Sequence, residues 1–169
     1  MILPVVVYPS PVLRQKSVAV SAERLKSDSF QTMLGYLHDT ATHHRAAGLA
    51  AIQVGVAERV LLALNTTSGK YVACINPEIL GLGGEPTCIQ EGCISFPNMT
   101  ANVYRNPEAM VRWTGMDGEL VERTVTGFEA QIFQHELKHL FGRLLIDELP
   151  KQYRADFLAR YHSLQRKAR

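Results

Sequence analysis

The sequence has little of what marks several large classes of proteins. Its three cysteines are an odd number with no secretory signal, which argues against a disulfide framework and favours free thiols in a reducing compartment. The 18 Lys and Arg against 16 Asp and Glu leave a net charge of only +2, too small to indicate a nucleic-acid or membrane surface. The apolar start, residues 1–7, has no basic flank and is too short to span a bilayer. We therefore expect a cytoplasmic protein that binds neither nucleic acid nor membrane, and a buried strand over residues 1–7.

The chain also shows no internal repeat, low-complexity tract or long linker. With 169 residues and a hydrophobic fraction of 46%, it can bury a core without disulfides. We expect one domain over residues 1–169, present as a monomer.

Hydrophobic periodicity and turn residues indicate the order of the elements in the first two thirds of the chain. Apolar residues at helical spacing predict a helix over residues 28–45, with Ser27 or Asp28 as its cap. Strands are predicted at residues 60–64 and 71–76, joined around Ser68-Gly69. Two more are predicted at residues 111–114 and 120–125, which flank the typical hairpin turn Asp117-Gly118.

Two further helices are predicted in the last third. One runs from about residue 128 to 141, between a cap at Thr126 and a stop at Gly142, and is apolar on nearly every side, as a buried helix is. The other begins after Pro150, and its docking stripe is formed by Tyr153, Phe157, Tyr161 and Leu164. Strands, a buried helix and helices towards both ends predict an α+β fold, with mixed or antiparallel β-sheets around a central helix.

The buried helix carries the strongest chemical signal, His135-Glu136-Leu137-Lys138-His139. Residues four apart on a helix project from the same face, so the two imidazoles can bind one metal ion from one side. At about 100° per residue, Glu136 lies about 80° to one side of this face and Lys138 about 80° to the other. Glu136 is therefore placed beside a bound metal ion, where a general base must be.

A metal ion held by two histidines needs a third ligand and an open position for water. The best candidate is Cys93, in the segment Glu91-Gly92-Cys93-Ile94-Ser95, because Gly92 lets backbone approach closely. The ordinary alternative is a buried free cysteine, and Cys74 and Cys88 offer only that.

A third segment, residues 46–53, is a run of small and apolar residues that ends in Gln53. Small residues let a substrate come close, and the Gln53 amide can donate to a developing oxyanion. On its own such a run more often reflects tight packing.

Together the three segments resemble the three signature motifs of the peptide deformylase family, in the right order and at suitable spacing. Residues 91–95 match the second motif in full, and residues 134–139 match the third. Residues 46–53 match the first motif except at Ala46, where the family usually has glycine. Lys138 stands where the family usually has aspartate. The start Tyr8 to Arg14 also resembles the family, so the resemblance covers nearly the whole chain.

The resemblance implies a metallohydrolase that removes the N-formyl group from formyl-methionine at the N-terminus of newly made polypeptides. It implies that Cys93, His135 and His139 hold the metal ion, and that Glu136 is general base and acid while a metal-activated water attacks the formyl carbon. Gln53 and the backbone N–H of Ile94 would receive the oxyanion. The substrate contacts that it implies are Ala47, Gly48 and Gly92, of which Gly48 would bond the peptide backbone. Ile89, Phe128, Gln131 and Ile132 would line the methionine pocket.

The resemblance also implies the cofactor and the partner. A cysteine with two histidines suits iron(II) or zinc; iron(II) is the expected native ion, and zinc or nickel are expected in isolated protein. The expected partners are formyl-methionyl nascent polypeptides, met at the ribosome.

Around the ligands, the aspartate that the family usually has at position 138 offers a carboxylate to a nearby arginine, and Arg105 resembles that arginine. In this chain the obvious anion for Arg105 is Glu91. Lys138 would compete for the same carboxylate, and two cations cannot both pair tightly with one partly buried anion. We expect Arg105 to keep Glu91 through its planar fork, and Lys138 to run outward with its ammonium in water.

Two other functions fit the histidine motif by itself. A zinc endopeptidase would take its third ligand from later in the chain, where Asp147, Glu148 and His162 are available. A non-enzymatic module with a structural metal ion would need four protein ligands, whereas the sequence offers three credible ones.

Overall fold

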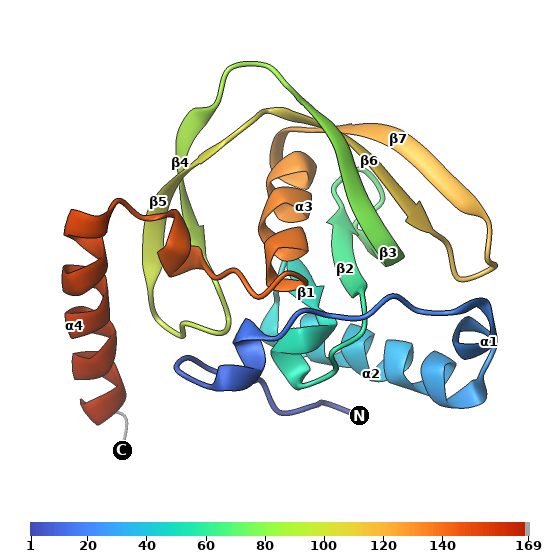
Figure 1. Cartoon of the computed structure of the whole chain (residues 1–169), viewed down its shortest axis with the longest axis horizontal. Helices are drawn as coiled ribbons and strands as arrows, with labels where there is room; N and C mark the ends of the chain where they lie inside the picture. The colour runs from blue at the N-terminus through green and yellow to red at the C-terminus, as the bar shows by residue number, and fades with distance from the viewer. Residues whose placement is uncertain (168–169) are drawn as a thin grey trace.

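Seven strands form two antiparallel sheets in a computed structural model that describes residues 1–167 (Figure 1). The strands are β1 (Gly48–Ala50), β2 (Val60–Asn65), β3 (Lys70–Gly83), β4 (Thr87–Gly92), β5 (Thr100–Arg105), β6 (Glu108–Thr114) and β7 (Leu120–Thr126). The larger sheet has the order β1-β2-β3-β6-β7, and β4 pairs with β5 in a separate two-stranded sheet. The α+β class with antiparallel sheets is thus confirmed.

The strands follow the predicted hydrophobic pattern, with longer bounds. In β6, buried and exposed residues alternate, so that Ala109, Val111 and Trp113 face the core. The turn to β7 passes through Gly118 at a φ of 88°, a conformation that glycine adopts without strain. β3 extends past the predicted end at Asn76 to Gly83, and irregular register between Ile75 and Glu78 bends it.

The helix α3 (Gly127–His139) is the centre of the molecule. It contacts β1, β2, β3, β6 and β7, and Figure 1 shows it inside the arch of the strands. Thr126 is the residue that precedes it, although its side chain makes no capping hydrogen bond. Just after its end Gly142 has a φ of 71°, and a Cβ there would lie 2.4 Å from the backbone oxygen of Arg14. The prediction of a buried central helix is confirmed.

Two longer helices lie towards the ends of the chain, as predicted. The helix α2 (Asp28–His44) begins at Ser27, whose hydroxyl accepts from the N–H of Phe30. It buries Phe30, Leu34 and Leu37 against the face of β1 and β2 opposite α3. Short helical turns complete the order: η1 (Pro11–Arg14), α1 (Ala22–Leu25), η2 (Ala51–Val54) and η3 (Leu145–Glu148).

The helix α4 (Lys151–Lys167) docks at one end of the molecule, beside β5 (Figure 1). Only half of its predicted stripe is buried. Phe157 and Tyr161 pack on Phe96, whereas Tyr153 and Leu164 are exposed. The helix contacts the rest of the molecule along one side only, and this contact is too narrow to bury all four side chains.

The prediction of a buried strand over residues 1–7 is wrong. The segment is irregular, and its backbone makes isolated hydrogen bonds, from the N–H of Val6 to the carbonyl of Gln53 and from Tyr8 to Ser95. Pro4 and Pro9 lack an N–H, which interrupts a ladder of hydrogen bonds. The segment instead ties together the two loops that follow β1 and β4.

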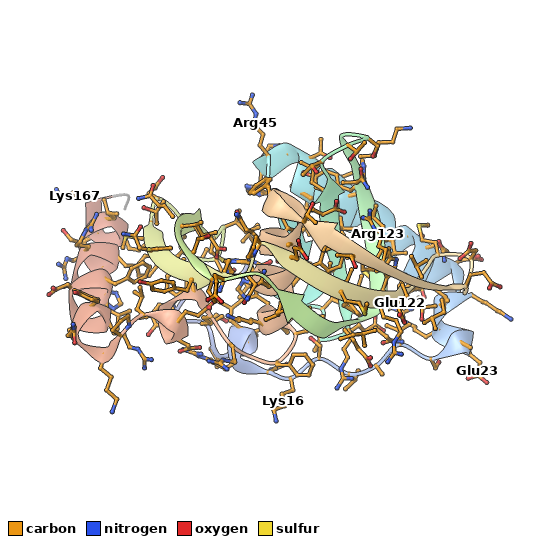
Figure 2. The ribbon with its side chains drawn as sticks, turned by 90° about the horizontal axis from the view of Figure 1, so that it is seen from above. Lys16, Glu23, Arg45, Glu122, Arg123 and Lys167 are labelled. Atoms are coloured by element: carbon orange, nitrogen blue, oxygen red, sulfur yellow. The ribbon has the colours of Figure 1, made fainter. Side chains whose placement is uncertain are left out.

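Charged side chains, such as Lys16 and Glu23, project from the surface into solvent (Figure 2). Within residues 1–167, none of the helices combines the length and apolar character needed to cross a membrane.

Candidate active site

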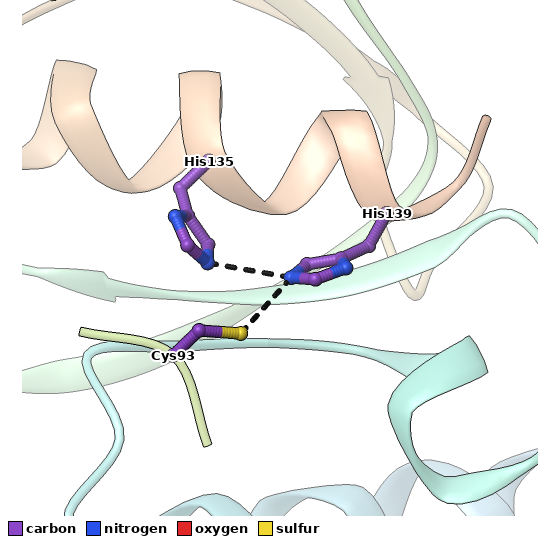
Figure 3. A group of neighbouring side chains, drawn as sticks. All are labelled: Cys93, His135 and His139. Atoms are coloured by element: carbon purple, nitrogen blue, oxygen red, sulfur yellow. Dashed lines mark hydrogen bonds between the residues drawn. The ribbon is translucent and has the colours of Figure 1, made fainter. Parts of the chain in front are cut away.

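The side chains of Cys93, His135 and His139 converge between α3 and the segment that follows β4 (Figure 3). Nε2 of His139 lies 3.3 Å from Nε2 of His135 and 3.4 Å from Sγ of Cys93. Both histidines are buried, and Cys93 is half-buried. The structure thus brings together the three residues predicted to hold a metal ion.

The spacing of these three atoms fits one tetrahedral metal ion. Metal–nitrogen bonds of about 2.0–2.1 Å and metal–sulfur bonds of about 2.3 Å place two nitrogens roughly 3.3 Å apart, and a nitrogen and a sulfur roughly 3.6 Å apart. The separations of 3.3 Å and 3.4 Å agree with these values. Burial lowers the pKa of His139 well below its usual value, which favours the neutral imidazole that a metal ion needs.

Glu91 orients one of the histidines from behind. Its Oε2 lies 2.9 Å from Nδ1 of His135, so Nε2 of the same ring points towards Cys93 and His139. Burial raises the pKa of the Glu91 carboxyl, but hydrogen bonds from His135 and Arg105 outweigh burial and hold it below its usual value. A carboxylate that accepts from Nδ1 fixes the tautomer in which Nε2 is free to bind a metal ion.

Glu136 lies beside the ligands, as its helical angle predicts. Its side chain is buried, and its Oε2 has no hydrogen-bond partner within the described residues. Burial raises the pKa of its carboxyl to about 7, although a nearby positive charge on His135 acts in the opposite direction. A carboxyl of this pKa can both take up and release a proton near neutral pH.

The backbone of β1 passes directly against Glu136. A Cβ at Gly48 would lie 2.6 Å from Cγ of Glu136 and 2.8 Å from Cγ2 of Ile132. Only glycine fits there without displacing Glu136 or Ile132, so the small residue at this position has a definite steric cause.

Gln53 holds the ligand loop and faces the same centre. Its Oε1 accepts from the N–H of Ala50 at 2.9 Å, and its Nε2 lies 3.2 Å from Oγ of Ser95 and 3.5 Å from Sγ of Cys93. With its oxygen occupied, the amide presents N–H donors to the space beside the thiol. Ile94, the other predicted donor, lines the same space.

A cavity of about 600 Å³ opens from this centre. Most of the predicted substrate residues line it: Ala47, Gly48, Gly92, Phe128, Gln131 and Ile132. Ile89 is not among them; it is partly buried and packs against the hydrophobic cluster around Phe96. Sequence reasoning missed further lining residues from distant segments, among them Val5, Val7, Asn98 and Met99.

The expected arrangement of Lys138 is wrong, while that of Arg105 holds. Arg105 donates to both carboxylate oxygens of Glu91, at 2.8 Å and 2.7 Å. Lys138 does not run free into water, because its ammonium pairs with Glu148, a carboxylate that Arg105 also contacts. Sequence reasoning considered Glu148 only as a metal ligand, so it missed this second anion.

The alternative ligands and cysteines lie outside the metal-binding group. Asp147 pairs with Arg14, Glu148 with Arg105 and Lys138, and His162 is exposed on α4. Cys74 is buried in the core, where burial raises the pKa of its thiol, and Cys88 is exposed. Among residues 1–167 the group has three members, which suits an open catalytic site better than a closed structural one.

The known proteins that this chain resembles belong to one family. Residues 2–155 match the family described as polypeptide deformylase. A peptide deformylase from Thermotoga neapolitana is 34% identical over 163 residues, which cover 96% of each chain. One from Xylella fastidiosa is 38% identical over 150 residues, 88% of this chain and 87% of its own.

Solved structures agree with these sequence matches. A peptide deformylase from Legionella pneumophila superposes with a TM-score of 0.90 at 28% identity, covering 100% of this chain and 99% of its own. The Met-Ala-Ser-bound crystal structure of a class I type b peptide deformylase from Acinetobacter baumannii has a TM-score of 0.82 at 31% identity, with 88% and 99% of the chains covered.

Proposed function

Because this chain belongs to the polypeptide deformylase family, we propose that Cys93, His135 and His139 hold one divalent metal ion at its active site. The activity is that of the family, hydrolytic removal of the N-formyl group from formyl-methionyl peptides. The observation that carries the proposed roles is the convergence of the thiol and two Nε2 atoms beside the buried carboxylate of Glu136. A divalent ion bound there would act as a Lewis acid and lower the pKa of water in its open position.

The residues of the chain account for the movement of protons. Water adds through its oxygen to the formyl carbon and gives a proton to the carboxylate of Glu136, which then delivers it to the leaving nitrogen as the C–N bond breaks. The products are formate and a free amino terminus. The Nε2–H of Gln53 and the backbone N–H of Ile94 would donate to the oxygen on which negative charge develops.

The cavity beside this centre supports the choice of substrate. Phe128 and Ile132 line its apolar part, which suits an unbranched side chain of methionine size, and Gln131 adds one polar edge. Gly48 belongs to an outer strand of the larger sheet, so an extended peptide can pair with it as an added strand.

We propose iron(II) as the native ion, with zinc or nickel able to take its place in isolated protein. One thiolate and two imidazoles form a ligand set that accepts all three ions. We also propose that the protein acts in the cytoplasm on nascent polypeptides at the ribosome, because formyl-methionine begins chains at translation and a thiolate ligand needs a reducing compartment.

The test is deformylation of formyl-Met-Ala-Ser by protein prepared without oxygen and supplied with iron(II). Formate release is expected, with cleavage of no internal peptide bond. The ligand assignment is tested separately: Cys93→Ala should lose most of its metal, while Cys88→Ala and Cys74→Ala should keep it. An active protein that retains full metal content as Cys93→Ala would contradict the assignment.

A further inference from the structure

The free edge of β1 defines the direction in which a peptide leaves the metal-binding group. β1 is the first strand of the larger sheet, and among residues 1–167 it pairs with β2 alone. The carbonyl of Ala47 accepts from the N–H of Leu64, so this carbonyl faces β2. Backbone groups alternate in direction along an antiparallel strand, so those of Gly48 face the free edge. One backbone bridge to an added peptide is therefore available at Gly48.

The formyl end of that peptide has a fixed place. Gln53 follows β1 and reaches Cys93, so the reacting centre lies past the C-terminal end of β1. A peptide whose formyl group lies there and whose methionine bridges to Gly48 must run antiparallel to β1. Its later residues then pass Ala47, Ala46 and Arg45 in turn, at about 3.3–3.4 Å per residue.

Backbone pairing ends before Arg45. The carbonyl of Ala46 accepts from the hydroxyl of Tyr71, and its N–H donates to the carbonyl of Ala41. The third and fourth residues of the peptide, which lie opposite Ala46 and Arg45, are therefore met by side chains and not by an extended sheet.

The side chains at this end of the cavity are basic. His44 and Arg45 line its mouth, and both are exposed. Arg45 ends α2 with a φ of 51°, and its guanidinium extends from the body of the molecule (Figure 2). Within residues 1–167, no carboxylate forms an ion pair with Arg45. The acidic residues that line the cavity are Glu91, which pairs with Arg105, and the buried Glu136.

We propose that Arg45, with His44 beside it, makes this enzyme favour formyl-methionyl peptides that carry Asp or Glu at the third or fourth residue. The inference rests on the proposed peptide-binding mode. An ion pair between exposed groups is worth little, so the expected gain is about two- to fivefold in kcat/KM at low ionic strength. Screening by salt should reduce it towards none.

The experiment compares formyl-Met-Ala-Ser-Ser with versions that carry Glu or the isosteric Gln at the third or the fourth residue. The ratio of kcat/KM for Glu to that for Gln is the measure, because it cancels effects common to both peptides. It is determined at about 20 mM and about 500 mM salt, a range over which the screening length falls severalfold. Affinity of the deformylated Glu and Gln products, measured by calorimetry, gives a second readout that does not depend on turnover.

The variants Arg45→Gln and Arg45→Glu should abolish and invert the preference, while Arg160→Gln, on the exposed face of α4, should keep it. A wild-type ratio of one at both positions, with both peptides deformylated, would overturn the charge preference alone. So would a ratio that survives in Arg45→Gln. Failure to deformylate any of the peptides would instead refute the proposed function, and this inference with it.

Discussion

Arg105 and Glu148 form an ion pair that is almost completely buried behind the metal-binding residues. The Arg105 side chain is 1% exposed and that of Glu148 is 11% exposed, and Nη2 of Arg105 donates to Oε1 of Glu148 at 2.8 Å. Arg105 also donates to Glu91, which in turn contacts His135. The guanidinium of Arg105 thus binds both carboxylates, and through Glu91 it is linked to His135 of the metal-binding group.

Replacing Arg105 with alanine would leave the carboxylates of Glu91 and Glu148 without their shared guanidinium. Removing one partner of a buried ion pair costs about 3–5 kcal/mol. Mutation of the groups that hold a ligating histidine by hydrogen bonds lowers metal affinity about 10- to 100-fold. We expect both effects in Arg105→Ala, measured by urea unfolding of the metal-loaded protein and by competition with a chelator.

Arg112→Ala is the matched control for that variant. It breaks the ion pair with Glu78, in which the Arg112 side chain is 38% exposed and that of Glu78 is 56% exposed. The loss of stability should therefore stay below about 1 kcal/mol. Wild-type metal affinity in Arg105→Ala would show that the guanidinium does not support the ligands.

The ion pair between Lys138 and Glu148 gives a second test of how the Glu148 carboxylate is stabilised. Lys138→Met removes the ammonium, and Lys138→Asp also adds a negative charge beside the Glu148 carboxylate. Both should destabilise the protein within the usual range of about 0.5–3 kcal/mol, with the aspartate variant the less stable of the two because like charges repel. Thermal unfolding of the two variants measures the difference. Equal stability of the two variants would mean that a negative charge beside the Glu148 carboxylate carries no cost.

These contacts show where sequence reasoning succeeds and where it stops. The central helix and its metal-binding face follow from local spacing, because residues four apart on a helix always share a face. The sequence offers Cys93 as the best third ligand and the family resemblance strengthens that choice, and the structure brings it to the histidines from a segment more than forty residues away.

The errors concern contacts that no local pattern records. Glu148 contacts Arg105 across 43 residues of sequence. Lys138 also pairs with Glu148, because attraction to this nearby anion outweighs hydration of its partly buried ammonium. Residues 1–7 have the composition of a strand, but hydrogen bonds to two separate loops hold them in an irregular path. The packing of Ile89 against the cluster around Phe96 likewise depends on contacts between distant segments, which composition does not determine.

Glu136→Gln tests the proposed proton carrier. The amide keeps the size of the side chain but cannot accept and return a proton, so the variant should bind metal normally and lose activity. General acid–base catalysis contributes about 10²–10⁴-fold, and a loss of at least this size is expected in kcat. Formate release and metal analysis provide the two measurements, and Glu122→Gln, an exposed glutamate of β7, is the control. Near-normal turnover in Glu136→Gln would remove Glu136 from the mechanism.

Gly48→Ala tests the packing of β1 on the same carboxylate. The added Cβ would lie 2.6 Å from Cγ of Glu136, so the side chain of Glu136 has to move. A displacement of about 1 Å at a catalytic group can cost about 10²-fold, and we expect a loss of this order with the metal retained.

Gly35→Ala is the matched control because a Cβ there would meet nothing within 4 Å. Gly35 lies inside α2, where alanine should stabilise the protein by about 0.5–1 kcal/mol without changing activity. Equal activity of Gly48→Ala and the wild type would show that the contact with Glu136 does not set its catalytic position.

Asp147 should make stability depend on pH through its pairing with Arg14. Burial raises the pKa of the Asp147 carboxyl, but hydrogen bonds from Arg14 and from the N–H of Leu144 hold it below its usual value. A carboxyl whose pKa is lowered by folding stabilises the folded state above its unfolded pKa, about 3.9, and this contribution is lost as the pH falls through the folded value.

The wild type should therefore exceed Asp147→Asn in free energy of unfolding most clearly near pH 7, with the difference shrinking as the pH falls below about 4. Asparagine keeps an oxygen for the N–H of Leu144, so the comparison isolates the charge. Urea unfolding across this pH range measures the difference, and Arg14→Gln should show the same trend because it removes the other partner. A difference that stays constant or grows on acidification would mean that the ion pair does not lower the pKa of Asp147.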